Sequence, residues 1–80
     1  MAVKVIFLGP LRDLAGEEMR DFAAPLTWNG LLVAVDEKLA EQLRSDRVNV
    51  ACGGKVLSDK TTLNASDGDE VALLPPVSGG

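Results

Sequence analysis

The stretch that decides the fold is residues 67–76, Asp67-Gly68-Asp69-Glu70-Val71-Ala72-Leu73-Leu74-Pro75-Pro76. Its opening Asp-Gly-Asp is a turn signal, because aspartate side chains hydrogen-bond to nearby backbone and glycine adopts a positive φ without strain. Residues 70–74 are mostly apolar and predict a strand. The two prolines end that strand, since neither can donate a hydrogen bond to a sheet ladder. The sequence therefore predicts a last strand followed by a short extended tail.

Four more strands are expected earlier in the chain, over residues 3–8, 17–23, 48–52 and 55–57. The first is β-branched and apolar and stops at Gly9-Pro10. A short helical turn over residues 11–16 leads to the second strand, whose alternation is weak. The third has period two, and the hairpin-type turn Gly53-Gly54 separates it from the fourth.

The clearest helical pattern begins after Thr27, which can act as the N-cap. Apolar residues then recur at i, i+4, i+7 and i+11, which is one face of a helix: Trp28, Leu32, Val35 and Leu39. We expect this single helix to end near Leu43 or Arg44. Gly30 in its first turn costs about 1 kcal/mol relative to alanine.

One long helix among these strands favours an α+β fold in which a mixed sheet packs on one main helix. A right-handed crossover through the helix places the last strand beside the first. That arrangement is the β-grasp, or ubiquitin-like, architecture. We expect one β-grasp domain over residues 1–74 and an extended tail over residues 75–80 that ends in Gly-Gly.

Composition narrows the function. The net charge of −4 and the scattered basic residues argue against nucleic acid and anionic membranes as partners. The absence of histidine removes the usual general base and the usual zinc ligand, so no metal site is expected. A single cysteine cannot form an internal disulfide, and no signal peptide or membrane-length apolar run is present. A reducing cytoplasm is the expected location.

The tail predicts chemistry at a chain terminus. Residues 75–80 can reach about 20 Å when extended. Glycine has no Cβ, so Gly79 and Gly80 can enter a narrow channel and leave a terminal carbonyl carbon open to attack. A free carboxylate needs activation by ATP as an acyl-adenylate, and a sulfur donor can then displace AMP to leave a thiocarboxylate. The side chains of this chain cannot perform those steps, so a partner enzyme must. The other interpretation is that the diglycine is a frayed end or a cloning remnant.

Two segments resemble the small subunit of molybdopterin synthase. Residues 4–8 followed by Leu11-Arg12-Asp13-Leu14-Ala15-Gly16 look like that family's first strand and its "LRE-x-x-G" turn. Residues 67–80, ending in Pro75-Pro76-Val77-Ser78-Gly79-Gly80, are similar to its closing motif almost residue for residue. A bare Gly-Gly would be weak support, whereas the longer ending is specific.

The resemblance implies a β-grasp sulfur carrier of molybdenum-cofactor biosynthesis that is not an enzyme by itself. Gly80 would carry the acyl-adenylate and then the thiocarboxylate, and Gly79, Ser78, Val77, Pro76 and Pro75 would form the inserting tail. The implied partners are an E1-like adenylyltransferase that uses ATP, a sulfur donor protein and the large synthase subunit. The sulfur would pass to cyclic pyranopterin monophosphate and give molybdopterin. The chain itself would bind no cofactor.

Alternatives remain open from the residues alone. The chain can be a sulfur carrier for thiamine thiazole, a thiolated nucleoside or an amino acid, or a ubiquitin-like modifier or interaction module. Leu8 and Leu74 are expected on the outer face of neighbouring strands as a docking patch, unless the chain's own loops cover them. Cys52 alternates with buried valines, which favours core packing over a sulfur-handling role.

Overall fold

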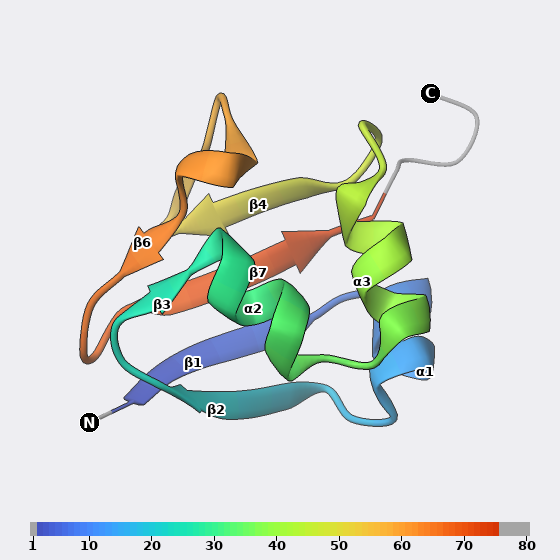
Figure 1. Cartoon of the computed structure of the whole chain (residues 1–80), viewed down its shortest axis with the longest axis horizontal. Helices are drawn as coiled ribbons and strands as arrows, with labels where there is room; N and C mark the ends of the chain where they lie inside the picture. The colour runs from blue at the N-terminus through green and yellow to red at the C-terminus, as the bar shows by residue number, and fades with distance from the viewer. Residues whose placement is uncertain (1, 76–80) are drawn as a thin grey trace.

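Strand β7 (Glu70–Leu74) occupies the centre of a five-stranded sheet whose order is β2-β1-β7-β4-β5 (Figure 1). The computed structural model describes residues 2–75. The other strands of this sheet are β1 (Ala2–Phe7), β2 (Met19–Ala23), β4 (Asn49–Cys52) and β5 (Lys55–Val56). Each of the five expected strands is present within two residues of its predicted bounds.

The sheet is mixed. β1 pairs parallel with β7 and antiparallel with β2, while β4 pairs antiparallel with both β7 and β5. The expected crossover that places the last strand beside the first is therefore confirmed, and so is the β-grasp arrangement.

A second, two-stranded sheet joins β3 (Leu26–Thr27) to β6 (Asn64–Ala65). Neither strand could be predicted from the sequence, because two residues are too few to show a period. A 3-10 turn, η1 (Lys60–Thr62), precedes β6. The buried side chains of Leu26 and Ala65 tie this small sheet to the core.

The single expected helix is wrong. The chain forms α2 (Trp28–Ala34) and α3 (Glu37–Arg44), and Val35 between them has extended backbone at φ −99° and ψ 165°. Valine and aspartate are both poor residues for a helix interior, so the pair Val35-Asp36 is where the helix breaks. The Thr27 N-cap is confirmed, because its hydroxyl oxygen accepts a hydrogen bond from the Gly30 amide.

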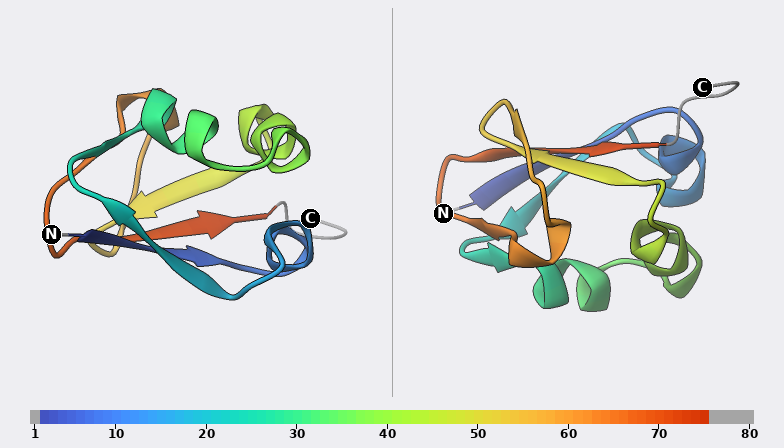
Figure 2. Two further views of the ribbon diagram at one scale, coloured as in Figure 1. Left: turned by 60° about the horizontal axis from the view of Figure 1, so that its bottom comes forward. Right: turned by 90° about the horizontal axis from the view of Figure 1, so that it is seen from above.

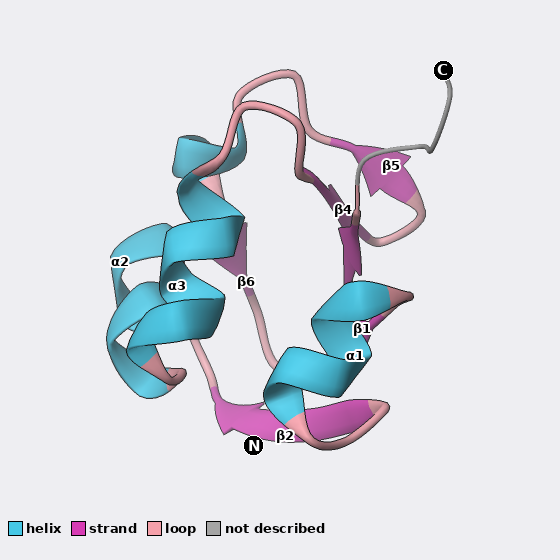
Figure 3. Ribbon diagram, turned by 90° about the vertical axis from the view of Figure 1, so that its right-hand side faces the viewer, coloured by secondary structure: helices cyan, strands magenta, loops and turns pink. Residues whose placement is uncertain are grey.

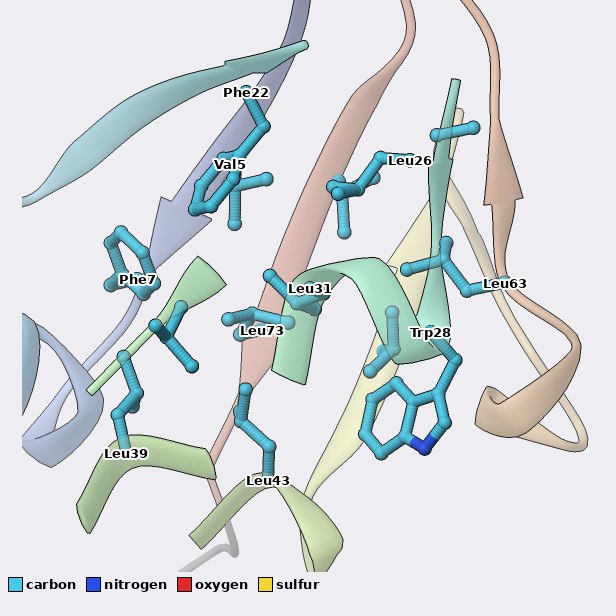
Figure 4. Close-up of a cluster of buried hydrophobic side chains, with 14 of the residues drawn as sticks. Val5, Phe7, Phe22, Leu26, Trp28, Leu31, Leu39, Leu43, Leu63 and Leu73 are labelled. Carbon is cyan, nitrogen blue, oxygen red and sulfur yellow. The ribbon is translucent and has the colours of Figure 1, made fainter. Parts of the chain in front are cut away.

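The helices cover one face of the sheet and leave the opposite face bare (Figure 2). Alternate residues of β1 and β7 point toward the helices and are buried: Val3, Val5, Phe7, Val71 and Leu73. Leu31, Leu39 and Leu43 close the core from the helical side (Figure 4). The short helix α1 (Pro10–Ala15) ends at Gly16 in the left-handed conformation, as expected.

The predicted turn at Asp67-Gly68-Asp69 clamps the start of β1. The Ala2 amide donates to Asp67 Oδ1 at 2.8 Å, and the Gly68 amide donates to the Ala2 carbonyl at 2.9 Å. Gly68 has a φ of +87°, a conformation that other residues adopt only with strain. These hydrogen bonds therefore join the start of β7 to the start of β1, in addition to the ladder hydrogen bonds between the two strands.

The orientation of α2 predicts that Leu31 contributes more to the core than Leu32 does. Leu31 is 0% exposed, whereas its neighbour Leu32 is only half-buried. Leu31→Ala should lower the free energy of unfolding by about 3 kcal/mol, because it leaves a cavity in the core, and Leu32→Ala by about half of that or less. Urea denaturation monitored by circular dichroism measures both. Equal losses would contradict the observed orientation of α2.

Candidate functional site

The predicted tail begins at Pro75, which follows β7 directly and is half-buried. Five of the predicted tail residues lie outside the described residues: Pro76, Val77, Ser78, Gly79 and Gly80. Because β1 and β7 run parallel, the end of β7, the end of β1 and α1 share one edge of the molecule (Figure 3). We call this edge the tail root.

Gly9 shapes the tail root. Its φ of +55° and ψ of −133° lie outside the regions that residues with a side chain occupy. A Cβ added at Gly9 would meet Cγ of Pro75 at 3.2 Å, which is closer than an ordinary contact. Glycine thus lets the loop between β1 and α1 pass directly against the first residue of the tail.

Leu8 and Leu74 lie beside this edge. Phe7 and Leu73 are register partners and both are fully buried, so the residue after each points to the outer face. Leu8 is 37% exposed and Leu74 is half-buried, so the chain's own loops leave the patch open. Their role in docking stays a prediction.

The outer face carries a longer apolar feature. Ile6 on β1 pairs with Met19 on β2 and with Ala72 on β7. Ala72 pairs with Ala51 on β4, which in turn pairs with Val56 on β5. These five residues form one apolar row across all five strands, which we call the outer row. Met19 is 46% exposed and Val56 59%, and the three between them are only partly covered.

The sequence indicated Leu8 and Leu74 as outward-facing residues but did not indicate the outer row. Alternation within one strand shows which residues share a face, but the register between strands decides which of them become neighbours. β2 has a weak pattern and β5 has only two residues, so neither gave its register. Met19 and Val56 are apolar and exposed, but only the register between the strands shows that they belong to one row.

Cys52 packs against the core, as predicted. Burial, together with the nearby Asp69 carboxylate, raises the pKa of the Cys52 thiol above its ordinary value. A raised pKa leaves less of the reactive thiolate at neutral pH. The geometry therefore gives Cys52 a structural role.

A hollow of about 350 Å³ lies between α2, the end of α3, the start of β4 and η1. Its wall includes Lys60, whose ammonium donates to the carbonyls of Ser45 and Val48, the latter at 2.9 Å. The same ammonium lies 5.6 Å from the centroid of the Trp28 ring. Burial lowers the pKa of Lys60, while the carboxylate of Asp46 acts in the opposite direction. Lys60 thus links η1 to the loop between α3 and β4, beside the Trp28 ring at the edge of the core.

Within residues 2–75 no group of three or more histidine, cysteine, aspartate or glutamate side chains is arranged to hold a metal ion. None of the described helices is long and apolar enough to cross a membrane. Among the described residues, the candidate functional features that lie close together are the tail root and the apolar residues of the outer face beside it.

A model of the ThiS family matches residues 5–80. The chain belongs to the ThiS family. Among curated relatives, this ThiS-family chain is 35% identical to the molybdopterin synthase sulfur carrier subunit of Escherichia coli strain K12, over 98% of this chain and 99% of the relative.

Solved structures agree with the β-grasp fold of this ThiS-family member. Subunit 1 or 2 in the protein–protein complex of the molybdopterin-converting factor from Helicobacter pylori 26695 matches with a TM-score of 0.67 and 30% identity, over 100% of both chains. SAMP1 from Haloferax volcanii matches with a TM-score of 0.73 and 25% identity, also over 100% of both chains.

The contact at the tail root predicts that two glycine variants of this ThiS-family chain will differ. Gly9 and Gly16 both have a positive φ, at 55° and 77°, but a Cβ at Gly16 meets nothing within 4 Å. Gly9→Ala and Gly16→Ala should each cost about 1–2 kcal/mol of stability through backbone strain. Only Gly9→Ala should also move Pro75, and it should therefore shift the NMR resonances of Leu74 and Pro75. Equal shifts in the two variants would contradict the contact.

Proposed function

We propose that this chain is the sulfur-carrying subunit of molybdopterin synthase. The observation that carries the proposal is its 35% identity to the E. coli sulfur carrier subunit over nearly the whole of both chains. The family match extends through residue 80, so it includes the diglycine Gly79-Gly80.

The proposed chemistry takes place on Gly80. An E1-like adenylyltransferase joins the terminal carboxylate to AMP from ATP and releases pyrophosphate. A sulfur donor protein then supplies the sulfur that displaces AMP, leaving a thiocarboxylate on Gly80. In the large synthase subunit that sulfur passes to cyclic pyranopterin monophosphate, and Gly79 allows the end of the tail to enter a narrow channel.

The remainder of the chain supports a carrier whose reactions are catalysed by partner enzymes. It has no histidine, and the pKa of its single cysteine is raised by burial. We therefore infer that the chain is a non-catalytic subunit, that it binds no cofactor of its own and that the partner enzyme binds the ATP. A cytoplasmic location is part of the same proposal.

The outer face supports docking to these partners. The Helicobacter pylori relative was solved in a complex of subunits 1 and 2 of its converting factor, so a chain of this fold is found with a protein partner. An uncovered apolar strip of sheet is the kind of surface that such a partner buries. We assign docking to the outer row together with Leu8 and Leu74, which lie between that row and the tail root.

A second candidate function is a ubiquitin-like modifier. Its support is the similarity to SAMP1, whose name in full is small archaeal modifier protein 1. A modifier would join Gly80 to a lysine of another protein, whereas a carrier for a different sulfur pathway would pass on a single atom. The products of these reactions differ in mass and in acceptor.

Mass spectrometry of the protein purified from its source distinguishes them. A thiocarboxylate adds about 16 Da to the intact chain, whereas conjugation adds a whole partner protein. A chain extended by one alanine after Gly80 should keep its fold and lose sulfur transfer, because the adenylated carbon then belongs to a residue with a Cβ. An alanine inserted after Met1 is the matched control and should transfer sulfur normally. Full activity of the extended chain would exclude chemistry at Gly80.

The docking assignment predicts a contrast between two exposed apolar residues. Leu8→Asp, beside the tail root, should weaken binding to the large synthase subunit by about tenfold or more, because it places a charge in a buried apolar interface. Val33→Asp is the control, since Val33 is 85% exposed on α2 in the helical layer. It should change the Kd by less than about twofold. Isothermal titration calorimetry measures both, and a reversed order would place the interface on the helices.

A further inference from the structure

A second row crosses the outer face on the side away from the tail. Lys4 on β1 pairs with Asp21 on β2 and with Glu70 on β7. All three side chains are exposed, and all three point outward, because their chain neighbours Val3, Phe22 and Val71 are buried. The register therefore places a negative, a positive and a negative charge side by side, which we call the charged row.

These charges are available to a partner. Among residues 2–75 the only ion pair is the one between Arg20 and Glu17, at 2.6 Å, so Lys4 makes no ion pair with either carboxylate. Neighbouring strands are about 4.8 Å apart, which puts Asp21 and Glu70 about 10 Å from each other with Lys4 between them. The charged row lies two residues along the strands from the outer row, or about 7 Å.

The two sides of the outer row thus differ in chemistry. On the tail side lie the apolar Leu8 and Leu74, and on the other side lies the charged row. An apolar strip by itself fixes an orientation poorly, because the hydrophobic effect is not directional. Charges at one border of the strip favour one of its two orientations on a partner.

We propose that the charged row orients the carrier on the large synthase subunit, so that the tail root faces the reaction site of that subunit. This inference rests on the proposed docking of the outer face and adds the partner's chemistry. The matching surface is an apolar strip bordered on one side by two cationic side chains about 10 Å apart, with a carboxylate between them. Charges at the border of an interface act mainly on the rate and geometry of encounter.

The test measures association with the purified large synthase subunit from the same source by stopped-flow fluorescence. Asp21→Lys/Glu70→Lys makes all three charges of the row positive. Its association rate should fall about tenfold at low ionic strength, and the difference should shrink as salt screens the charges.

Glu37→Lys/Glu41→Lys on α3 is the matched control. Both glutamates are exposed in the helical layer, and the double change alters the net charge by the same amount. Its association rate should stay within about twofold of the wild type. Equal slowing of the two double variants would mean that only net charge matters and would overturn the proposal.

One further variant separates this inference from the proposed function. Ala72→Asp puts a charge in the middle of the outer row and should abolish binding if that face docks. Loss of binding in Ala72→Asp with no effect of the charged-row variants would overturn the orienting role alone. Normal binding of Ala72→Asp would overturn docking through this face and the orienting role with it, while thiocarboxylate formation on Gly80 would still be tested by mass.

Discussion

The parallel pairing of β1 with β7 is the interaction on which the rest of the structure depends. It joins the first and the last strand in the centre of the sheet and buries Val5 beside Val71 and Phe7 beside Leu73. Because the strands are parallel, both of them end at the same edge. That shared end places Gly9 against Pro75 and makes the base of the tail part of the folded domain. The hydrogen bonds from the turn at residues 67–69 hold the opposite end of the same pair.

The alternation of side chains along the central strands also separates the residues that pack in the core from those that face outward. One set of residues in each central strand packs under α2 and α3, and the other set faces outward without cover. Burial shifts the pKa values of Cys52 and Lys60, and both side chains serve structure. The thiol packs on the core, and the ammonium joins two backbone carbonyls over the Trp28 ring. The groups to which we assign a function are the tail and the outer face.

Much of this architecture could be predicted from the sequence, because its signals are local. Short apolar or alternating runs bounded by turn residues gave the five main strands, and the Asp-Gly-Asp turn and the prolines gave the bounds of β7. The break at Val35-Asp36 could not be predicted, since the apolar spacing from Trp28 to Leu39 fits one continuous helix. The outer row and the charged row depend on the register between strands far apart in sequence, and a single sequence does not contain that register. The tail could be proposed as a site from the sequence because its signal is a motif and needs no tertiary contact.

The division of each strand into inner and outer residues has an evolutionary consequence. A substitution at Ile6, Ala72 or Lys4 changes what the domain presents to other proteins and leaves the packed layer beneath it almost untouched. Duplicated copies of such a domain can therefore diverge toward different protein partners while each copy still folds. The scaffold separates the mutations that alter partnership from those that threaten folding, which favours the spread of one small domain into many pathways.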